Sequence, residues 1–535
     1  MRIKNIYIHD WLELKPYSNQ VATDTYYLRL SNEVKNAIVN NKNKFILQVY
    51  LNENELNILS CFLTSYFEDI ISETNIWNSF IKAHKRLYKK QLPFYILDEY
   101  YENEINPQDI IFLIWYFINT IQQEKFIAPY NDFLIEIGNT IFDIFDNSWA
   151  YAPENTYLKS FYQIDKDEKD FYVARKIIDT VLFNTYLFYP DTYLKLKEQQ
   201  LEIIENSKDD EDLMMFMNEN RDKNLHNIHT RLLSFKGKEW VSEIIDNKQL
   251  SKDYLEISHK IQGFFLYKGQ DNDNIFIEHI ASSKEFNLTK KSFDYSNTLK
   301  ELDTILFLGI VKWKNEWWFS GVFFQHPYNT DLIIDEKNSL ESLSSVNFLD
   351  HDKKETLDIL KNQLSAFKDI NNGSQIAFLH SEQIEQFVND YIEFYNKTLK
   401  LTKKEINAIK QRTNENSCFG LNNSNFSDIS ETGLVFFNPK AGLEVAMAIN
   451  SAFPLQSNPF FKKEESEEQL LHLLMDKSLS TELVMFCIDN CKNKLLFFKQ
   501  GVGKKYLEDI DFLLRFWKLD DYYTLPRITY TSKKN

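Results

Sequence analysis

Glycine is scarce in this sequence, with 12 residues among 535, whereas ordinary proteins contain roughly 7%. Glycine supplies positive φ in tight turns and lets the backbone approach phosphate groups closely. Its scarcity argues against the nucleotide enzymes that depend on Gly-rich loops, and it favours a packed, mostly helical body. Gly138 is the one glycine before Gly237, so the later glycines mark where the architecture changes.

Cysteine and long apolar runs are scarce as well. The longest apolar run, residues 110–118, is far shorter than the roughly 20 residues of a membrane span. The first residues also lack the pattern of a signal peptide. The sequence therefore predicts a soluble, cytoplasmic protein without a membrane partner. Four cysteines are too few for a disulfide framework and have no neighbouring ligands for zinc, so free thiols and no metal are expected for Cys61, Cys418, Cys487 and Cys491.

Positively charged residues are fewer than negatively charged ones. The chain has 61 Lys and Arg against 78 Asp and Glu, which gives a net charge of -17. Bulk attraction to nucleic acid or to an anionic membrane is not expected from such a chain. The most basic stretch is residues 84–90 (HKRLYKK), at the end of a predicted helix. A solvated cationic end that complements the helix dipole explains this stretch, and a local basic patch is the alternative.

What the chain has in abundance is apolar and aromatic residues, at 43% and 15% of the sequence. A chain of this length divides into several domains. Residues 1–250 show apolar residues recurring at intervals of three and four, as in residues 27–38 and 56–70, which predicts an all-α domain. Residues 107–122 are apolar nearly all round, so we expect this helix at the centre of that domain.

The pattern changes at Gly263 to short β-branched and aromatic runs. Strands are predicted at residues 263–267, 275–280, 286–289, 305–313 and 316–325, with a hairpin across Lys314 and Asn315. Five short strands in so few residues favour a small SH3-like or OB-like β-barrel over residues 251–345. Glycines at 263, 269, 309 and 321 suit the corners of a tightly curved sheet.

Residues 346–535 are predicted to form an α+β domain. Helices are expected at 351–368 and 382–399, a strand at 375–379 and a polar loop at 414–430. A strand at 434–437 is expected to lead through residues 438–442 into a helix. A last strand at 495–498 should turn at Gly501 and Gly503 into another helix. The fold class is thus multi-domain and mainly α, with three successive parts.

Three segments resemble an uncharacterised bacterial domain-of-unknown-function family. They are YIHDWLELKPY at residues 7–17, NPKAGLE at 438–444 and FLLRFW at 512–517. The resemblance implies membership over nearly the full length of the chain. It implies no activity.

Arg221 and His226, within the run RDKNLH, are the strongest catalytic candidates. The run resembles the RX4H motif of HEPN ribonucleases, in which an Arg and a His on a helical bundle cut RNA without metal. A near-neutral imidazole can deprotonate a 2′-hydroxyl, and a guanidinium can stabilise the developing phosphate charge. The chain has one copy of the motif, so this reading requires a dimer. In the alternative reading, Arg221 pairs with the acidic run at 209–212.

Other motifs carry weaker signals. His226 and His229 lie one helical turn apart without a third metal ligand, so packing explains them. Residues 499–505 (KQGVGKK) lack the first Gly and the Ser/Thr of a phosphate loop, and no cofactor is predicted. Lys440 follows Asn438 and Pro439 at an expected helix start, where backbone N–H groups could bind an anion or simply be capped by Asn438.

Aromatic residues crowd the predicted hairpin, including Trp313, Trp317 and Trp318. Alternation along a strand places Trp317 on one face and Trp318 on the other. One face should form the barrel core. The other is either covered by a neighbouring domain or exposed as a binding surface for a partner.

The leading hypothesis is a cytosolic interaction or regulatory protein without enzymatic activity, in a setting such as bacterial phage defence. It would bind a macromolecule, a protein rather than a nucleic acid, through the barrel and the helical surface. The alternative is a HEPN-like, metal-independent endoribonuclease acting as a dimer through Arg221 and His226. The oligomeric state is left open.

Overall fold

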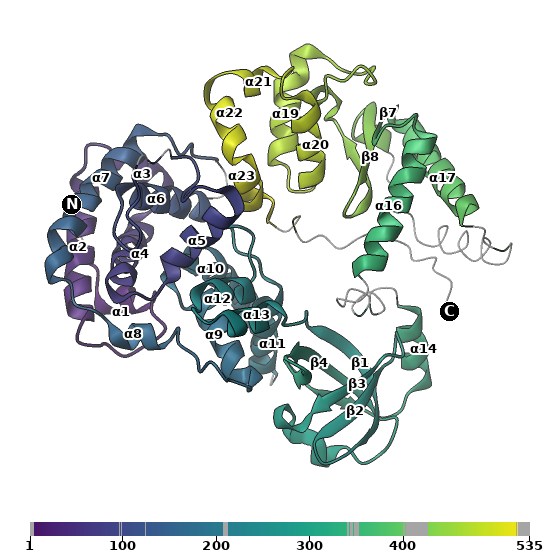
Figure 1. Cartoon of the computed structure of the whole chain (residues 1–535), viewed down its shortest axis with the longest axis horizontal. Helices are drawn as coiled ribbons and strands as arrows, with labels where there is room; N and C mark the ends of the chain where they lie inside the picture. The colour runs from purple at the N-terminus through teal and green to yellow at the C-terminus, as the bar shows by residue number, and fades with distance from the viewer. Residues whose placement is uncertain are drawn as a thin grey trace. The chain divides into compact units, whose positions relative to one another are not determined.

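The computed structural model describes residues 5–95, 97, 99–122, 125–206, 212–339, 342, 346, 353–399, 402, 426–519 and 522. The chain divides into two compact units, residues 1–349 and 350–535 (Figure 1). The predicted boundary at 345/346 is close to this division. The predicted parts 1–250 and 251–345 belong to one unit.

The first unit begins with helices and ends with a barrel (Figure 1). Its helices before the barrel are α1 (Ile8–Leu12), α2 (Asp24–Asn40), α3 (Lys44–Tyr50), α4 (Glu53–Ser72), α5 (Ile76–Tyr88), α6 (Pro107–Ile121), α7 (Asp132–Ser148), α8 (Thr156–Ser160), α9 (Phe171–Phe183), α10 (Leu194–Asn206), α11 (Leu213–Asn227), α12 (Gly237–Ile244) and α13 (Lys248–Leu255). The prediction of an all-α N-terminal region is confirmed.

Helix α6 forms the centre of the helical region, as its composition predicts. Pro107 occupies its first turn, where a missing N–H costs nothing. Every residue from Asp109 to Thr120 is buried, and α6 packs against α4 and α7. No helix in the described part of the chain combines the length and apolarity needed to cross a bilayer.

The segment at residues 7–17 supplies a buried polar network that joins α1 to α4. The Lys15 ammonium pairs with the Glu68 carboxylate and donates to Ser65 Oγ at 3.0 Å. Both side chains of the ion pair are almost fully buried, so each charge depends on the other for compensation. Trp11 Nε1 donates to Asp24 Oδ1 at 2.9 Å and links the same segment to α2.

The barrel follows α13 and closes on itself. Its strands are β1 (Ile261–Gln270), β2 (Asn274–His279), β3 (Glu285–Thr289), β4 (Ile305–Trp313) and β5 (Glu316–Phe319), and β6 (Phe324–His326) adds to β4 outside the closure. The closed order is β1-β2-β3-β5-β4-β1, with β3 and β5 parallel at Leu288 and Trp317. This order matches an OB-like rather than an SH3-like barrel. Helix α14 (Thr330–Asn338), which the sequence did not suggest, packs through Leu332 and Ile333 against the outer face.

The sequence predicted one strand over residues 316–325, but the structure has two. Gly321 has φ of +94°, and the turn at residues 320–323 shifts the register by two residues before β6 resumes pairing along the same edge of β4. A left-handed residue of this kind interrupts a strand.

The second unit has a three-stranded antiparallel sheet covered on both faces. The sheet order is β7 (Ile376–His380), β8 (Thr432–Asn438), β9 (Gly442–Met447). Alternation along β8 directs Leu434 and Phe436 into one core and Val435 and Phe437 into another. The helices are α16 (Lys353–Ile370), α17 (Ser381–Thr398), α19 (Ser466–Met475), α20 (Thr481–Cys491), α21 (Leu496–Lys499), α22 (Gly501–Tyr506) and α23 (Ile510–Trp517).

Two local predictions in this unit are wrong. Residues 438–442 form the turn of the β8–β9 hairpin rather than a helix start, because Asn438 Oδ1 accepts from the N–H groups of Lys440 and Ala441 at 2.9 and 3.1 Å and Gly442 takes φ of +97°. Residues 495–498 run into helix α21 instead of forming a strand. The predicted loop at 414–430 and Cys418 lie largely outside the described residues.

Candidate functional site

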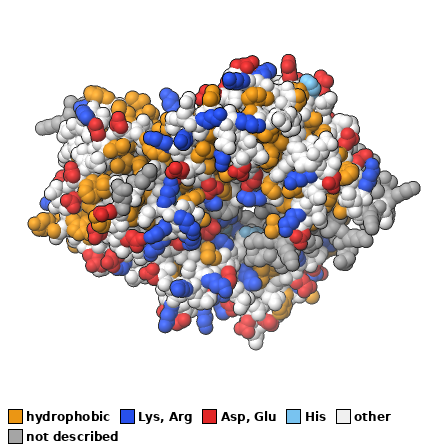
Figure 2. All heavy atoms as spheres, turned by 45° about the horizontal axis from the view of Figure 1, so that its top comes forward, with side chains coloured by type: hydrophobic (Ala, Val, Ile, Leu, Met, Phe, Trp, Pro, Cys, Tyr) orange, Lys and Arg blue, Asp and Glu red, His pale blue; other side chains and the backbone are white. Residues whose placement is uncertain are grey.

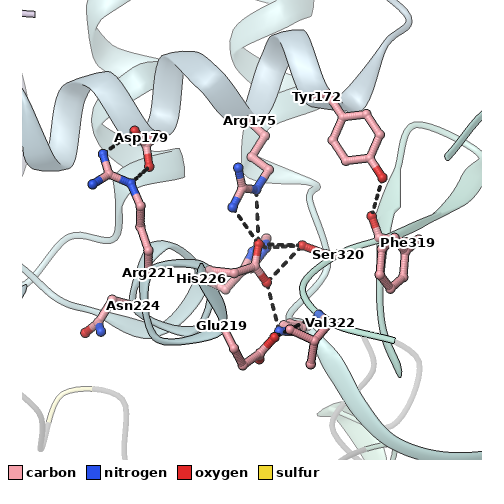
Figure 3. A network of polar contacts seen from close by, with 12 residues as sticks. Tyr172, Arg175, Asp179, Glu219, Arg221, Asn224, His226, Phe319, Ser320 and Val322 are labelled. Carbon is pink, nitrogen blue, oxygen red and sulfur yellow. Dashed lines mark hydrogen bonds and ion pairs between the residues drawn. The ribbon is translucent and has the colours of Figure 1, made fainter. Parts of the chain in front are cut away.

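Helix α11 carries both residues of the RX4H-like motif, but it directs them to different neighbours (Figure 3). Residues five apart on an α-helix are separated by about 140° around the axis. Arg221 reaches α9, where its Nε and Nη2 donate to the two carboxylate oxygens of Asp179 at 2.7 and 2.6 Å. Its guanidinium also lies over the Phe183 ring. The acidic run 209–212, the partner predicted for Arg221, lies outside the described residues except for Asp212, and the structure shows Arg221 in a bidentate pair with Asp179.

His226 faces the barrel and is buried there. Its Nε2 lies 3.1 Å from Ser320 Oγ, and its ring stacks on Phe171. The pKa of His226 is lowered to about 3, mainly by burial and also by the nearby Lys260 and Arg175 charges, against the opposing effect of Asp222. The imidazole is therefore neutral at physiological pH and is a poor proton acceptor.

Asp222, the residue after Arg221 in the motif, is the centre of the junction between helices and barrel. Arg175 of α9 donates to Asp222 Oδ1 through Nε at 3.1 Å and Nη2 at 2.7 Å. Ser320 Oγ donates to the same oxygen at 2.8 Å, and Lys260 Nζ lies 2.8 Å from Oδ2. Burial raises the pKa of Asp222, but the interactions with His226, Lys260 and Arg175 outweigh it and hold the pKa well below its usual value.

Glu219, one turn before Asp222 on α11, extends the junction along the barrel. Its Oε1 accepts from Lys260 Nζ at 2.6 Å and Gln262 Nε2 at 2.9 Å. Its Oε2 accepts from the backbone N–H of Val322 at 2.9 Å. Glu219 and Asp222 thus face Lys260 and Arg175, and the two negative charges are balanced by two positive ones.

Two of the rare glycines lie at this junction. A Cβ at Gly309 would stand 2.3 Å from Lys260 Cε, and one at Gly321 would stand 2.4 Å from Glu219 Oε2. A side chain at either position would displace the Lys260–Glu219 pair from the strands. Glycine suits both positions because the side chains of Glu219 on α11 and of Lys260, just before β1, approach the barrel backbone closely.

The arrangement does not form a Ser-His-Asp relay. In such a relay the carboxylate binds Nδ1 of the imidazole while the serine binds Nε2. Here Asp222 and His226 Nε2 both contact the Ser320 hydroxyl, and Asp222 Oδ1 is 3.9 Å from Nε2. Ser320 is 1% exposed, so its hydroxyl has no open path to a substrate.

The tryptophans predicted as binding residues fall on both faces of the hairpin, as alternation predicts. Trp313 and Trp318 are 1% and 2% exposed. The Trp313 indole packs on Tyr254 of α13, and Trp318 packs on Phe171 and Tyr172 of α9. Trp317 is half-buried and packs against the barrel core. Of the two alternatives for the outward-facing tryptophans of the hairpin, coverage by the helical region is the one that the structure has for Trp313 and Trp318.

The remaining predicted sites have structural partners. Lys440 Nζ lies 2.6 Å from Glu482 in the second unit and above the Tyr522 ring. His229 lies after the end of α11 and forms an isolated β-bridge with Lys236. It is therefore not on the same helix as His226, as the predicted metal-ligand spacing would need. Within the described ranges, no three His, Cys, Asp or Glu side chains are grouped as a metal would require.

The sequence did not single out Arg175, Lys260 or Ser320, which complete the junction. Arg175 comes from α9, Lys260 immediately precedes β1 and Ser320 immediately follows β5, so no local spacing connects them. The one signal available was the clustering of glycines at 309 and 321, which marks a close approach without identifying its partners.

Part of the junction lies in a region of the chain that matches a family of known sequences. Residues 5–266 match the model of a family described as "Protein of unknown function (DUF3843)". These residues, just under half of the chain, are similar to that family. The DUF3843 region includes the segment at 7–17 and all of α11, and it ends within β1. The matched region is shorter than the nearly full-length resemblance that the sequence predicts. The segments 438–444 and 512–517 lie outside the matched residues. No curated protein and no solved structure matches the chain.

Proposed function

We propose that this chain is a non-enzymatic interaction protein that binds a protein partner through the outer face of the barrel. The observation that carries the proposal is a row of three aromatic rings on adjacent strands, Phe264 of β1, Phe307 of β4 and Phe324 of β6. We call this row the aromatic strip.

The strand register places the three rings side by side. Phe264 pairs directly with Phe307, and Phe307 pairs directly with Phe324. The centroids of the first two rings are 5.1 Å apart and those of the last two 6.1 Å apart. Phe264 and Phe307 are half-buried and Phe324 is 37% exposed. Grouped aromatic rings left partly in water are typical of surfaces that a partner covers.

The edge of the sheet beside the strip supports a peptide as the partner. Strand β6 ends the sheet order, and among the described strands it pairs with β4 alone. Its three residues are exposed, as is Tyr328 just beyond it. An extended peptide can add to such an edge through backbone hydrogen bonds while its side chains contact neighbouring rings.

The charge distribution favours a protein over a nucleic acid. OB-like barrels bind oligonucleotides through the face of strands 2 and 3 and the loop between strands 1 and 2. Here that region carries Asp271, Asp273, Glu278 and Glu285. On the face drawn in Figure 2, basic and acidic side chains are interspersed rather than gathered into one broad basic surface. Phosphate contacts need such a surface.

The ribonuclease alternative has no support from the junction, because Arg221 is held by Asp179 and His226 is buried against Ser320. It stays a prediction, as does a place in bacterial phage defence. The cytoplasmic location is also a prediction.

Site-specific photo-crosslinking in the native host tests the proposal. A benzoylphenylalanine at position 324 is expected to capture a protein that the same probe at Tyr151, 80% exposed on the helical region, does not capture. The captured partner, once purified, should bind the wild-type chain in calorimetry. The double variant Phe307→Thr/Phe324→Thr should weaken this binding by about 30-fold or more, because buried aromatic contacts dominate such interfaces.

The matched control is Tyr151→Thr, which should leave the affinity unchanged. Circular dichroism and thermal unfolding establish that the double variant folds. Capture of the same proteins from both positions, or unchanged affinity in a folded double variant, would show that the strip is not the binding surface.

A further inference from the structure

The geometry points to a binding site for a phosphorylated small molecule in a pocket beside α5. The pocket has a volume of about 370 Å³ and lies between α5 and the turn at residues 100–103. Its lining residues are Asn78, Ile81, Lys82, Lys85, Arg86, Tyr100, Glu102 and Asn103. We call it the α5 pocket. It is separate from the junction and from the aromatic strip, and the inference does not depend on the proposed function.

Positive charge on the pocket wall comes from one face of α5. Lys82, Lys85 and Arg86 stand at helical spacings of three and four, so their side chains project together. All three are exposed, while the opposite face of α5 is buried through Trp77, Phe80 and other residues. Three cations face one lining carboxylate, Glu102. In a chain with a net charge of -17, this excess of positive charge is a local exception.

The helix dipole accounts for only part of this charge. Lys85 and Arg86 lie in the last turn of α5, where cations are favoured by about 0.3–1 kcal/mol. Lys82 lies before that turn and gains less from the dipole. Like charges at these spacings repel one another, so grouping Lys82 with them has a cost that an anionic ligand would offset.

The pairs that the cations make leave Lys82 and Lys85 available to a ligand. Lys85 Nζ is 2.9 Å from Glu102 Oε1, and both side chains are about half exposed, so solvent weakens this pair. Arg86 pairs with Glu243 of α12, which fixes its side chain at the edge of the pocket. Lys82 approaches Glu102 closely enough to lower the pKa of its carboxyl, after the larger effect of Lys85.

The rest of the pocket is rigid and chemically mixed. Asn78 Nδ2 donates to Asn103 Oδ1 at 2.9 Å and ties the helix to the turn. The Tyr100 hydroxyl is fixed by Asp109 at 3.2 Å, so its ring presents a steady apolar surface beside Ile81. Cations at one side, amide groups and an apolar floor are what a small molecule with a phosphate group requires. The volume is that of a small-molecule site.

A nucleic acid is a less suitable occupant. Its backbone would continue beyond the pocket and meet a chain of net negative charge, whereas a small phosphate ester would need the α5 pocket alone. The two occupants therefore give different results in a binding test.

Titration calorimetry with inorganic pyrophosphate and inorganic phosphate, on the full chain at low salt, tests the inference. Saturable binding of one pyrophosphate per chain is expected, tighter than that of phosphate, because more of its charge can reach both lysines. Lys82→Gln/Lys85→Gln should weaken pyrophosphate binding by about tenfold or more. Both substituted side chains are exposed, and thermal unfolding should show the variant folded.

The matched control is Lys248→Gln/Lys252→Gln, which removes the same charge from exposed positions of α13. An equal loss in this variant, or no saturable binding by the wild-type chain at millimolar pyrophosphate, would overturn the inference. A labelled 20-nucleotide RNA forms the last arm. If RNA bound more tightly than pyrophosphate and lost affinity in Lys82→Gln/Lys85→Gln, the site would belong to nucleic acid and the small-molecule assignment would be wrong.

Discussion

Replacing Asp222 by alanine is expected to lower the free energy of unfolding by about 3–5 kcal/mol, because a buried ion network would lose its central carboxylate. Lys260, whose side chain is 3% exposed, would keep Glu219 alone as a counter-ion. Arg175 would lose its partner, and the Ser320 hydroxyl would lose its acceptor. Urea unfolding followed by tryptophan fluorescence measures the change.

The pH dependence of the same network has a defined sign. The pKa of Asp222 is held well below its unfolded value, so the carboxylate contributes stability above pH of about 4. That stability is lost as pH falls below the unfolded pKa toward the lower folded pKa. The wild-type chain should therefore show no loss from this group between pH 8 and 5, and the difference between wild type and Asp222→Ala should shrink only in stronger acid.

Asp179→Ala provides the matched control, since Asp179 also holds an arginine through two hydrogen bonds. The Arg221–Asp179 pair is more exposed, with side-chain exposures of 32% and 15%, so its loss should cost about 1 kcal/mol. Equal costs for the two variants would contradict the assignment of Asp222 as the centre of the junction.

Asp109→Asn is expected to stabilise the chain at pH 8 by up to about 4 kcal/mol and to have little effect at pH 4. Asp109 lies fully buried in the first turn of α6 and accepts from Tyr66 and Tyr100 hydroxyls at 2.9 and 3.2 Å. Burial raises the pKa of its carboxyl to about 7, against the lowering effect of these hydrogen bonds. The unfolded value is about 3.9.

The sign follows from the direction of this shift. Between pH of about 4 and 7 the folded chain holds the Asp109 proton more tightly than the unfolded chain, so stability falls as pH rises through this window. About three units correspond to about 4 kcal/mol. An asparagine keeps the oxygen acceptor without the charge, and its variant should lack this pH dependence.

Unfolding free energies at pH 4, 6 and 8 test this expectation. Asp143→Asn, at an exposed position on α7, controls for the change in net charge and should follow the wild type. If Asp109→Asn lost stability by the same amount at every pH, the carboxyl would be ionised throughout and its raised pKa would be refuted.

The sequence predicted those parts of the fold that depend on local pattern. The apolar period of α6 identified the central helix, and the short aromatic runs from Gly263 identified the barrel. The local errors arose where the same short run of residues is compatible with two different structures. Asn438 followed by Pro439 suits a helix N-cap and also a hairpin turn, and only pairing with β9 decides between them.

The candidate site was less predictable because its residues converge from distant segments. Arg221 and His226 were grouped by sequence spacing, although a helix places residues five apart on different faces. Asp222 lay within the same motif, but its role depends on Arg175, Lys260 and Ser320, which no local pattern connects to it. The covering of Trp318 by α9 likewise depends on how the helices meet the barrel.

Incubation of the purified chain with mixed RNA in EDTA tests most directly whether Arg221 and His226 hold the junction rather than cut RNA. The expected result is intact RNA with the wild-type chain and with Arg221→Lys and His226→Gln alike. Cleavage by the wild-type chain that disappears in both variants, while thermal unfolding shows them folded, would contradict a structural role for this pair.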